Sequence, residues 1–336
     1  MRAPRLSDRD LLRLIAGGDP DENEDLFAQA RKARQKHYGN GVYFRGLIEI
    51  TNYCRNDCYY CGLRRSNAKL ERYRLSLEEI LACCRAGDRL GYKTFVLQGG
   101  DDPRLSDTRA VEIISAIRRE FPGHALTLSF GERSRESYAA FFAAGGNRYL
   151  LRHESASEEH YARLHPPDMN PAKRKECLRN LKDIGFQTGA GFMVGSPFQT
   201  PENLLEDLRF LEELQPQMIG IGPFIPHKDT PFGEDGAGGL TLTLKMIALT
   251  RIMLPKALIP ATTALGTIVR DGWEQGFMAG ANVIMPNLTP ASARRLYALY
   301  DNKVYAGDGA EALDYLAGRI RKAGLTPEMG RGDAPR

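Results

Sequence analysis

From residue 41 onward, short apolar runs alternate with longer amphipathic stretches. This alternation is typical of repeated strand and helix units that build a parallel sheet. Eight such units predict a complete (β/α)8 barrel of the TIM type, and a doubly wound open sheet is the alternative. Strands are expected over residues 46–51, 94–98, 125–130, 149–152, 188–194, 218–223, 259–264 and 282–286.

Two segments between the expected strands carry clear signals for the start of a helix. Ser76 and Glu79 have the spacing of a capping box, and Thr200 stands directly before Pro201. A hydroxyl at the N-cap and a proline at the first helical position both favour helix initiation. Helices are therefore expected to begin at both places.

The same pattern divides the chain into three parts. Residues 1–40 are expected to form a short helical extension, in which Leu11 and Ile15 share an apolar face. The barrel is expected to span residues 41–325. The polar tail over residues 326–336 is predicted to be disordered.

Composition narrows the class of protein. The chain has 336 residues, of which 42% are hydrophobic and 26% charged, as in an ordinary globular protein. The net charge is only +4, and basic residues are interspersed with acids along the expected helices, so no nucleic-acid partner is expected. No apolar run has the length of a signal peptide or a membrane helix, which predicts a cytoplasmic protein with no membrane partner.

Three of the six cysteines lie close together after the first expected strand. Cys54, Cys58 and Cys61 form a C-x3-C-x2-C trio, and three thiolates can hold a 4Fe-4S cluster with one iron left open to a ligand. The alternative is a zinc site, for which His153 or His165 would have to supply the fourth ligand. The other three cysteines fall on expected helices and are expected to be simply buried.

Other candidate residues lie at the ends of later strands. Gln98, Gly99 and Gly100 end the second strand, where two glycines allow close backbone approach to a ligand, although this is also an ordinary glycine-rich turn. Arg148 and Arg152 fall on one face of the fourth strand, so both are expected to enter the barrel lumen. They would bind an anion there, and internal ion pairs are the alternative.

The cysteine motif and its position resemble the radical S-adenosylmethionine (SAM) superfamily. The resemblance implies that SAM binds the open iron of a 4Fe-4S cluster held by Cys54, Cys58 and Cys61. It also implies that an electron from this cluster cleaves SAM to a 5'-deoxyadenosyl radical. The SAM contacts implied by the resemblance are Tyr60, Gln98, Gly99, Gly100, Glu154, Arg174 and Met193.

Longer segments, including Phe44 to Arg65, 148–155, 220–231 and 259–267, resemble the HydE family of iron-only hydrogenase maturases. The resemblance implies a small iron complex carrying carbon monoxide, cyanide and cysteine as the substrate. It also implies a ferredoxin or flavodoxin as electron donor and other maturation proteins as partners. The residues expected to bind this substrate are Arg148, Arg152, Thr262, Thr263, Ala264, Met285 and Tyr297.

Two departures and two alternatives accompany this resemblance. Gly99 stands where the family often has serine, and the chain lacks the second cysteine trio of some members, so no second cluster is expected. A radical mutase acting on an amino acid, similar to methylornithine synthase, is the alternative enzyme. A non-enzymatic zinc or iron-sulfur module is the alternative from a different class.

Overall fold

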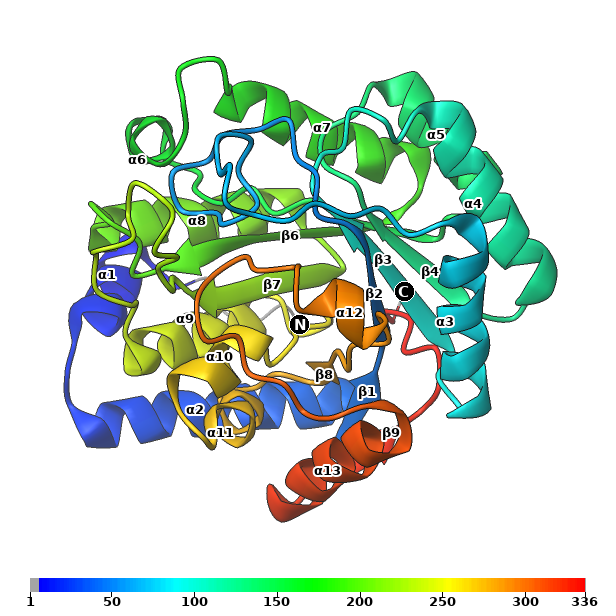
Figure 1. Cartoon of the computed structure of the whole chain (residues 1–336). Coiled ribbons are helices and arrows are strands. Elements are labelled where there is room, and N and C mark those ends of the chain that lie inside the picture. Colours follow the sequence, from blue (N-terminus) through cyan, green and yellow to red (C-terminus); the bar gives the residue numbers. More distant parts are fainter. Residues whose placement is uncertain (1–5, 336) are drawn as a thin grey trace.

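The computed structural model describes residues 6–335, which form thirteen helices and nine strands (Figure 1). The helices are α1 (Asp8–Ala16), α2 (Pro20–Tyr38), α3 (Leu77–Arg89), α4 (Asp107–Glu120), α5 (Arg135–Ala143), α6 (Glu158–Leu164), α7 (Pro171–Ile184), α8 (Pro201–Leu214), α9 (Leu240–Met253), α10 (Thr263–Ile268), α11 (Gly272–Met278), α12 (Ala291–Arg294) and α13 (Gly309–Lys322). The strands are β1 (Gly41–Phe44), β2 (Gly46–Thr51), β3 (Thr94–Gly99), β4 (Ala125–Ser129), β5 (Arg148–Leu150), β6 (Gln187–Val194), β7 (Met218–Pro223), β8 (Val283–Ile284) and β9 (Thr326–Glu328).

The strands are parallel and form two sheets that share one continuous extended segment. One sheet has the order β2-β3-β4-β5-β6-β7, and the other has the order β8-β1-β9. Only Arg45 separates β1 from β2. Backbone hydrogen bonds continue from β7 through residues 258–261 to β8 and on to β2. These bonds are Ile219 N to Leu258 O (3.0 Å), Ala261 N to Val283 O (2.9 Å) and Leu47 N to Pro286 O (2.8 Å).

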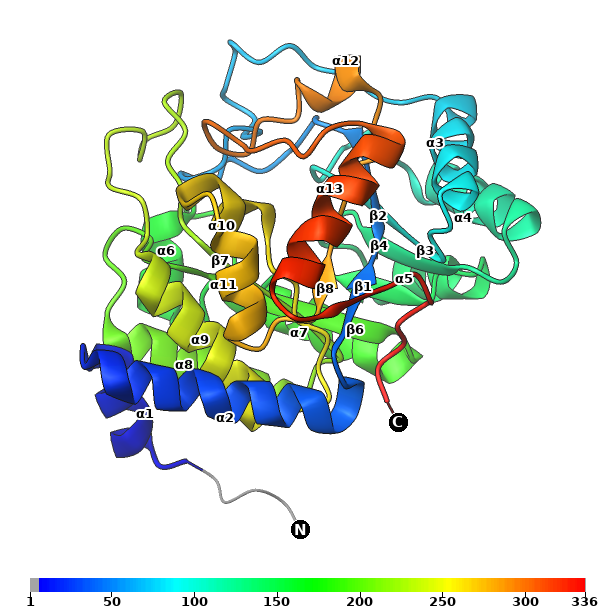
Figure 2. The same cartoon turned by 90° about the horizontal axis from the view of Figure 1, so that it is seen from below.

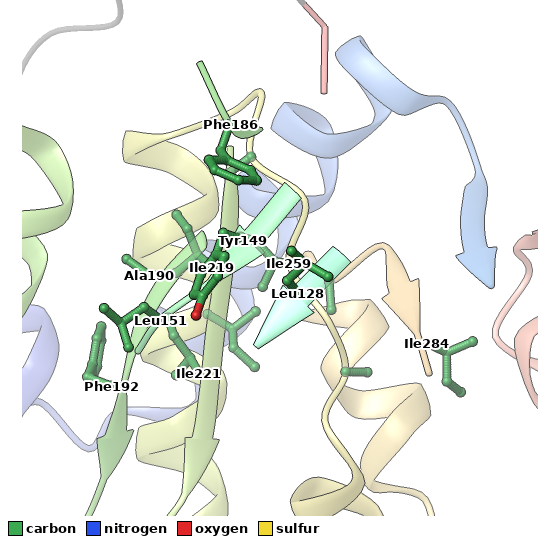
Figure 3. Close-up of a cluster of buried hydrophobic side chains, with 14 of the residues drawn as sticks. Leu128, Tyr149, Leu151, Phe186, Ala190, Phe192, Ile219, Ile221, Ile259 and Ile284 are labelled. Atoms are coloured by element: carbon green, nitrogen blue, oxygen red, sulfur yellow. The ribbon is translucent and has the colours of Figure 1, made fainter. Parts of the chain in front are cut away.

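Alternation along the strands separates an outer face from an inner one. Tyr149 on β5, Ala190 on β6 and Ile219 on β7 are fully buried in the main core (Figure 3). They pack in the same cluster as apolar residues of the surrounding helices, such as Leu178 on α7. Because successive side chains of a strand point to opposite faces, the residues between these positions lie on the inner face.

The helix signals read from the sequence are confirmed. Ser76 and Glu79 form a capping box at α3, and the Thr200 hydroxyl accepts a hydrogen bond from a backbone N–H at the start of α8. In the N-terminal extension, Leu11 and Ile15 are buried, and α2 packs along α9 (Figure 2). Within residues 6–335, we find no helix with enough length and apolar character to cross a membrane.

The prediction of a seventh strand over residues 259–264 is wrong for the second half of this segment. Residues 258–260 form only isolated bridges to β7 and β8, and α10 begins at Thr263. Pro260 has no N–H, so it cannot donate to a regular ladder. Thr263 and Ala264 therefore lie on a helix, and the eighth strand is shortened to Val283 and Ile284.

The prediction of a disordered tail is also wrong for residues 326–335. β9 pairs with β1 in parallel, and the Thr94 hydroxyl donates to Arg331 O at 2.9 Å. Gln187 Nε2 donates to the Asp333 carboxylate at 2.8 Å. The tail has few apolar side chains, but its carbonyl and carboxylate oxygens accept hydrogen bonds from side chains at the N-terminal ends of the strands. Arg336 lies outside the described residues.

Arg148 is the most deeply buried contact of this tail. Its side chain is fully buried, and its guanidinium donates to Arg331 O at 2.8 Å and to Asp333 at 2.7 Å. Arg45 and Arg148 both donate to Gly332 O, at 3.4 and 3.2 Å. Arg148 therefore belongs to the N-terminal end of the strands, which contradicts its expected role in substrate binding and supports the alternative of an internal ion pair.

We predict that Asp333→Ala lowers the free energy of unfolding by about 1–2 kcal/mol, since the partly exposed carboxylate is the one acid that pairs with Arg148 among the described residues. Partial burial alone would raise the pKa of Asp333. Hydrogen bonds from Arg148, Arg331 and Gln187 outweigh this effect and hold the pKa well below its usual value. The stabilisation is therefore present at neutral pH and should shrink as the pH falls below about 4.

Urea unfolding of wild type and variant at several pH values measures this difference. Asp314→Ala, on the exposed face of α13, is the matched control and should change little. Equal stability of Asp333→Ala and wild type at neutral pH would contradict the assignment.

Candidate active site

The cysteine trio lies on the loop that leaves the C-terminal end of β2. All three cysteines are half-buried, and Cys61 N donates to Cys58 O at 3.4 Å within a tight turn. The loop is fastened to the end of β3, because Arg55 donates its backbone N–H to Asp101 O at 2.8 Å and its side chain contacts the Asp101 carboxylate at 2.9 Å. The carboxyl ends of two neighbouring strands thus hold the loop.

The glycines after β3 permit this close approach. A Cβ atom on Gly100 would lie 2.2 Å from Tyr53 O and 2.9 Å from Cys54 Cβ. A Cβ atom on Gly99 would lie 2.8 Å from the Thr51 methyl group. Serine, which the family often has at position 99, would therefore have to displace Thr51 in this chain.

Asp101 and Asp102 support the loop, and the sequence analysis did not assign them to the site. Asp102 accepts two hydrogen bonds from Arg74, at 2.6 and 2.9 Å, and one from the Thr51 hydroxyl at 2.9 Å. The signal was available, since two acids directly follow the glycine pair in the sequence. Their role in positioning depends on partners distant in the chain, which a local motif does not reveal.

Tyr60 and Met193, both expected to contact SAM, come together in the structure. Tyr60 packs against a small apolar cluster that contains Met193 and Leu164. Its hydroxyl is 3.1 Å from His165 Nε2, and burial lowers the pKa of His165 to about 3, so the imidazole is neutral. An aromatic ring beside a thioether and a neutral imidazole is a suitable wall for a planar heterocycle.

Glu154 and Arg174 lie close enough to Cys58 for their charges to act on its thiol. Arg174, on α7, donates to Arg152 O at 2.9 Å and contacts Glu132 at 3.0 Å. Glu154 has a positive φ of 66°, and its Oε2 lies 3.3 Å from Arg152 Nη2. Among the described residues, neither of these two buried atoms makes a hydrogen bond. The two charges are paired with each other, but their unmade hydrogen bonds leave polar atoms that a ligand can satisfy.

A cavity of about 560 Å³ contains several of the expected substrate residues. Thr263, Met285 and Tyr297 line it, and the Tyr297 hydroxyl accepts a hydrogen bond from Gln98 Nε2 at 3.2 Å. Gln98 thus connects this cavity to the glycine pair.

Three other expected substrate residues lie outside the lining of this cavity. The Thr262 hydroxyl is buried without a hydrogen-bond partner among the described residues and would lie 2.9 Å from a Cβ on Gly222. Arg152 runs along Gly220, and Ala264 is buried on α10. The other six expected substrate residues therefore lie toward the C-terminal ends of the strands, while Arg148 lies at the N-terminal ends.

The zinc alternative lacks a fourth ligand. His153 Nε2 is 3.2 Å from Asp207, and its Nδ1 accepts the Gly191 N–H at 3.3 Å. Both nitrogens of His165 are likewise engaged, with Tyr60 and with Tyr161 O. In the part of the chain that the structure describes, no three His, Cys, Asp or Glu side chains are grouped to hold a single ion.

The donor set does fit an iron-sulfur cluster, in which each thiolate binds an iron of its own. Burial raises the pKa of Cys58 to about 12 and also raises the pKa of Cys61, so the free thiols hold their protons at neutral pH. Iron would replace these protons on binding. The unsatisfied atoms of Arg152 and Glu154 near the loop fit a polar ligand such as SAM.

Comparison with known proteins agrees with this chemistry. Residues 48–211 match the Radical SAM superfamily. The chain is 50% identical over 282 residues to the FeFe hydrogenase maturase subunit HydE of Thermotoga maritima, covering 84% of this chain and 80% of that protein. It is 30% identical over 306 residues to 3-methylornithine synthase of Methanosarcina acetivorans, covering 90% and 86%. The crystal structure of methylornithine synthase (PylB) superposes with a TM-score of 0.85 at 28% identity, covering 96% of this chain and 94% of that one.

These relatives show that the alternative of a non-enzymatic metal module is wrong, because the chain is a radical SAM enzyme. They also support the two cofactors that the sequence predicts, since enzymes of this superfamily use a 4Fe-4S cluster and SAM. The chain belongs to the HydE family of FeFe hydrogenase maturases within the radical SAM superfamily.

Proposed function

We propose that this enzyme reductively cleaves SAM at a 4Fe-4S cluster and directs the 5'-deoxyadenosyl radical to an iron complex carrying carbon monoxide, cyanide and cysteine. The reaction would serve assembly of the active-site subcluster of FeFe hydrogenase. The observation that carries the proposal is the shared location of the cysteine loop, the unsatisfied Arg152 and Glu154 atoms and the 560 Å³ cavity at the C-terminal ends of the strands. The 50% identity to HydE supports the same function.

In this proposal the cysteine trio holds the cluster, and neighbouring side chains hold SAM. Tyr60 and Met193 would contact the adenine, because they form one apolar wall. The backbone at Gly99 and Gly100 would bind the methionine amino group. Glu154 and Arg174 would bind the ribose and the carboxylate, as expected from their charges and their position beside Cys58.

The substrate would bind deeper, in the cavity that Thr263, Met285 and Tyr297 line. Arg152 and Thr262 lie outside this lining, and they would bind anionic groups of the substrate that extend beyond the cavity, since both have buried polar atoms without hydrogen bonds among the described residues. Ala264 would contribute only an apolar contact with the substrate. Arg148 has no part in this site, because the tail occupies its guanidinium.

We further propose that the strands close into a complete (β/α)8 barrel over residues 41–325. The hydrogen bonds from β7 through Leu258 to β8 and β2 support closure. A closed barrel matters for this chemistry, because it surrounds a reactive radical with protein and excludes water. The half-buried cysteine loop would receive electrons from a reduced ferredoxin or flavodoxin, and other maturation proteins would supply the substrate and accept the product.

A second function is favoured by one observation. The PylB crystal structure matches this chain over 96% of its length, so an amino acid mutase would have the same framework. Its substrate would be lysine, in place of the iron complex. The two functions differ in the molecule that stimulates SAM cleavage.

We predict that the anaerobically reconstituted and reduced enzyme forms 5'-deoxyadenosine faster with the iron precursor and not with lysine. Chromatographic assay of deoxyadenosine, with each compound added separately, measures the difference. Stimulation by lysine alone would instead assign the mutase function.

We also predict that Cys58→Ala loses cluster binding while its fold is retained, because the loop is held by Asp101 and the glycine pair independently of a metal. Iron and sulfide analysis with circular dichroism measures both properties. Cys177→Ala, which removes a buried thiol on α7, is the control and should bind the cluster normally. Global unfolding of Cys58→Ala would point to a structural metal.

A further inference from the structure

A segment that contains one expected substrate residue, Tyr297, crosses the C-terminal ends of the strands. We call residues 296–304, between α12 and α13, the mouth strap (Figure 1, orange). It is attached to the cysteine loop, to the loop after β7 and to α10. The bonds are Asn52 Nδ2 to Leu296 O (2.8 Å), Gly62 N to Leu299 O (2.9 Å), Asp301 N to Pro226 O (3.1 Å) and Val304 N to Thr267 Oγ1 (3.1 Å).

Lys303 extends from this strap to a buried acid on β2. Its Nζ lies 2.6 Å from Glu49 Oε1 and donates to Tyr297 O at 3.4 Å. It also lies 5.1 Å from the centre of the Tyr297 ring. Glu49 is only 1% exposed, and its second oxygen accepts a hydrogen bond from Asn287 at 2.8 Å. Hydrogen bonds therefore hold both the Glu49 carboxylate and the Lys303 ammonium group in place.

The arrangement presents a positive charge to the cavity. Lys303, Tyr297 and Asn287 line the 560 Å³ cavity, whereas Glu49 lies behind them and is not part of its lining. An ammonium group has three N–H donors, and two hydrogen bonds of Lys303 are made to described residues. One donor therefore remains for a ligand.

Two other charged residues on the cavity wall have partners of their own, and Arg295 also lines the cavity. Arg294 pairs with Asp308 at 2.6 Å, and Asp301 accepts the Lys228 backbone N–H at 2.8 Å. Arg294 ends α12 and Asp308 directly precedes α13, whereas Asp301 lies on the mouth strap itself. Lys303 lies instead beside Tyr297, whose hydroxyl reaches Gln98 at the end of β3.

We propose that Lys303 is a specificity-determining contact that binds an anionic group of the substrate, and that Glu49 is the residue that positions it. The proposal rests on the proposed function, and it narrows the substrate to a molecule with a carboxylate or another anionic group that reaches the β2 side of the cavity. The cysteine of the iron complex carries such a carboxylate.

The test compares half-saturating concentrations of the iron complex in deoxyadenosine formation by the reconstituted holoenzyme. Lys303→Met should raise this concentration about tenfold or more, because a charge-assisted hydrogen bond is lost. Lys303→Arg keeps the charge and should recover most of the affinity. Lys322→Met, on the exposed face of α13, is the matched control and should behave as wild type.

A double variant distinguishes substrate binding by Lys303 from mere neutralisation of the Glu49 charge. Lys303→Met alone leaves Glu49 buried and unpaired, whereas Lys303→Met with Glu49→Gln removes both charges. If Lys303 served only to neutralise Glu49, the double variant would regain wild-type saturation, and the proposal would be overturned. A double variant as weak as Lys303→Met supports it.

Two further results would each overturn the inference, with different consequences for the proposed function. Wild-type saturation in Lys303→Met overturns the inference and leaves the proposed function intact. A wild-type enzyme that does not respond to the iron complex at all refutes the proposed function, and the inference falls with it.

Discussion

The structure depends on one constraint, which is the cost of placing a charge among the parallel strands. Such a charge must meet an opposite charge or a full set of hydrogen bonds. At the N-terminal ends of the strands, Arg148 meets this requirement through Asp333 and three tail or strand oxygens. At the C-terminal ends, Glu49 meets it through Lys303 and Asn287. Arg152 and Glu154 meet it only partly, and they are the ones beside the cysteine loop.

The two arginine–carboxylate pairs differ in their hydrogen bonding. Arg148 and Asp333 are hydrogen-bonded to each other and to neighbouring groups, although Arg148 Nε has no partner among the described residues. The incomplete pair near Cys58 leaves polar atoms available to a ligand. The extent of burial does not explain which pair has polar atoms available to a ligand, since Arg148 is more deeply buried than Arg152. A direct hydrogen bond between the charged groups does distinguish the two pairs, since Arg148 donates to Asp333 whereas Arg152 Nη2 and Glu154 Oε2 make no hydrogen bond among the described residues.

Local patterns predicted much of this architecture. The first six expected strands, the capping box at Ser76, the N-cap at Thr200 and the position of the cysteine trio follow from periodicity and spacing, which act within a few residues. Period two predicts Arg148 and Arg152 on one face, but β5 ends at Leu150, before Arg152. This periodicity did not show that these two arginines, which are four residues or about 13 Å of extended chain apart, lie toward opposite ends of the strands.

Contacts between distant parts of the chain account for what the sequence analysis missed. The tail gains its order from Thr94, Arg148 and Gln187, which lie well over 100 residues away in sequence. The mouth strap likewise depends on partners from the cysteine loop and from α10. Neither segment has the periodicity of a regular element, so only the folded structure reveals its role.

The docked tail has a consequence for biosynthesis. Residues 326–335 follow β2 to β8 in the sequence, so they are synthesised after the strands whose ends they cover. Until they dock, Arg45 and Arg148 have no acceptor in Gly332 O. Docking of this segment, and not the folding of the earlier units alone, therefore supplies these acceptors at the base of the sheet.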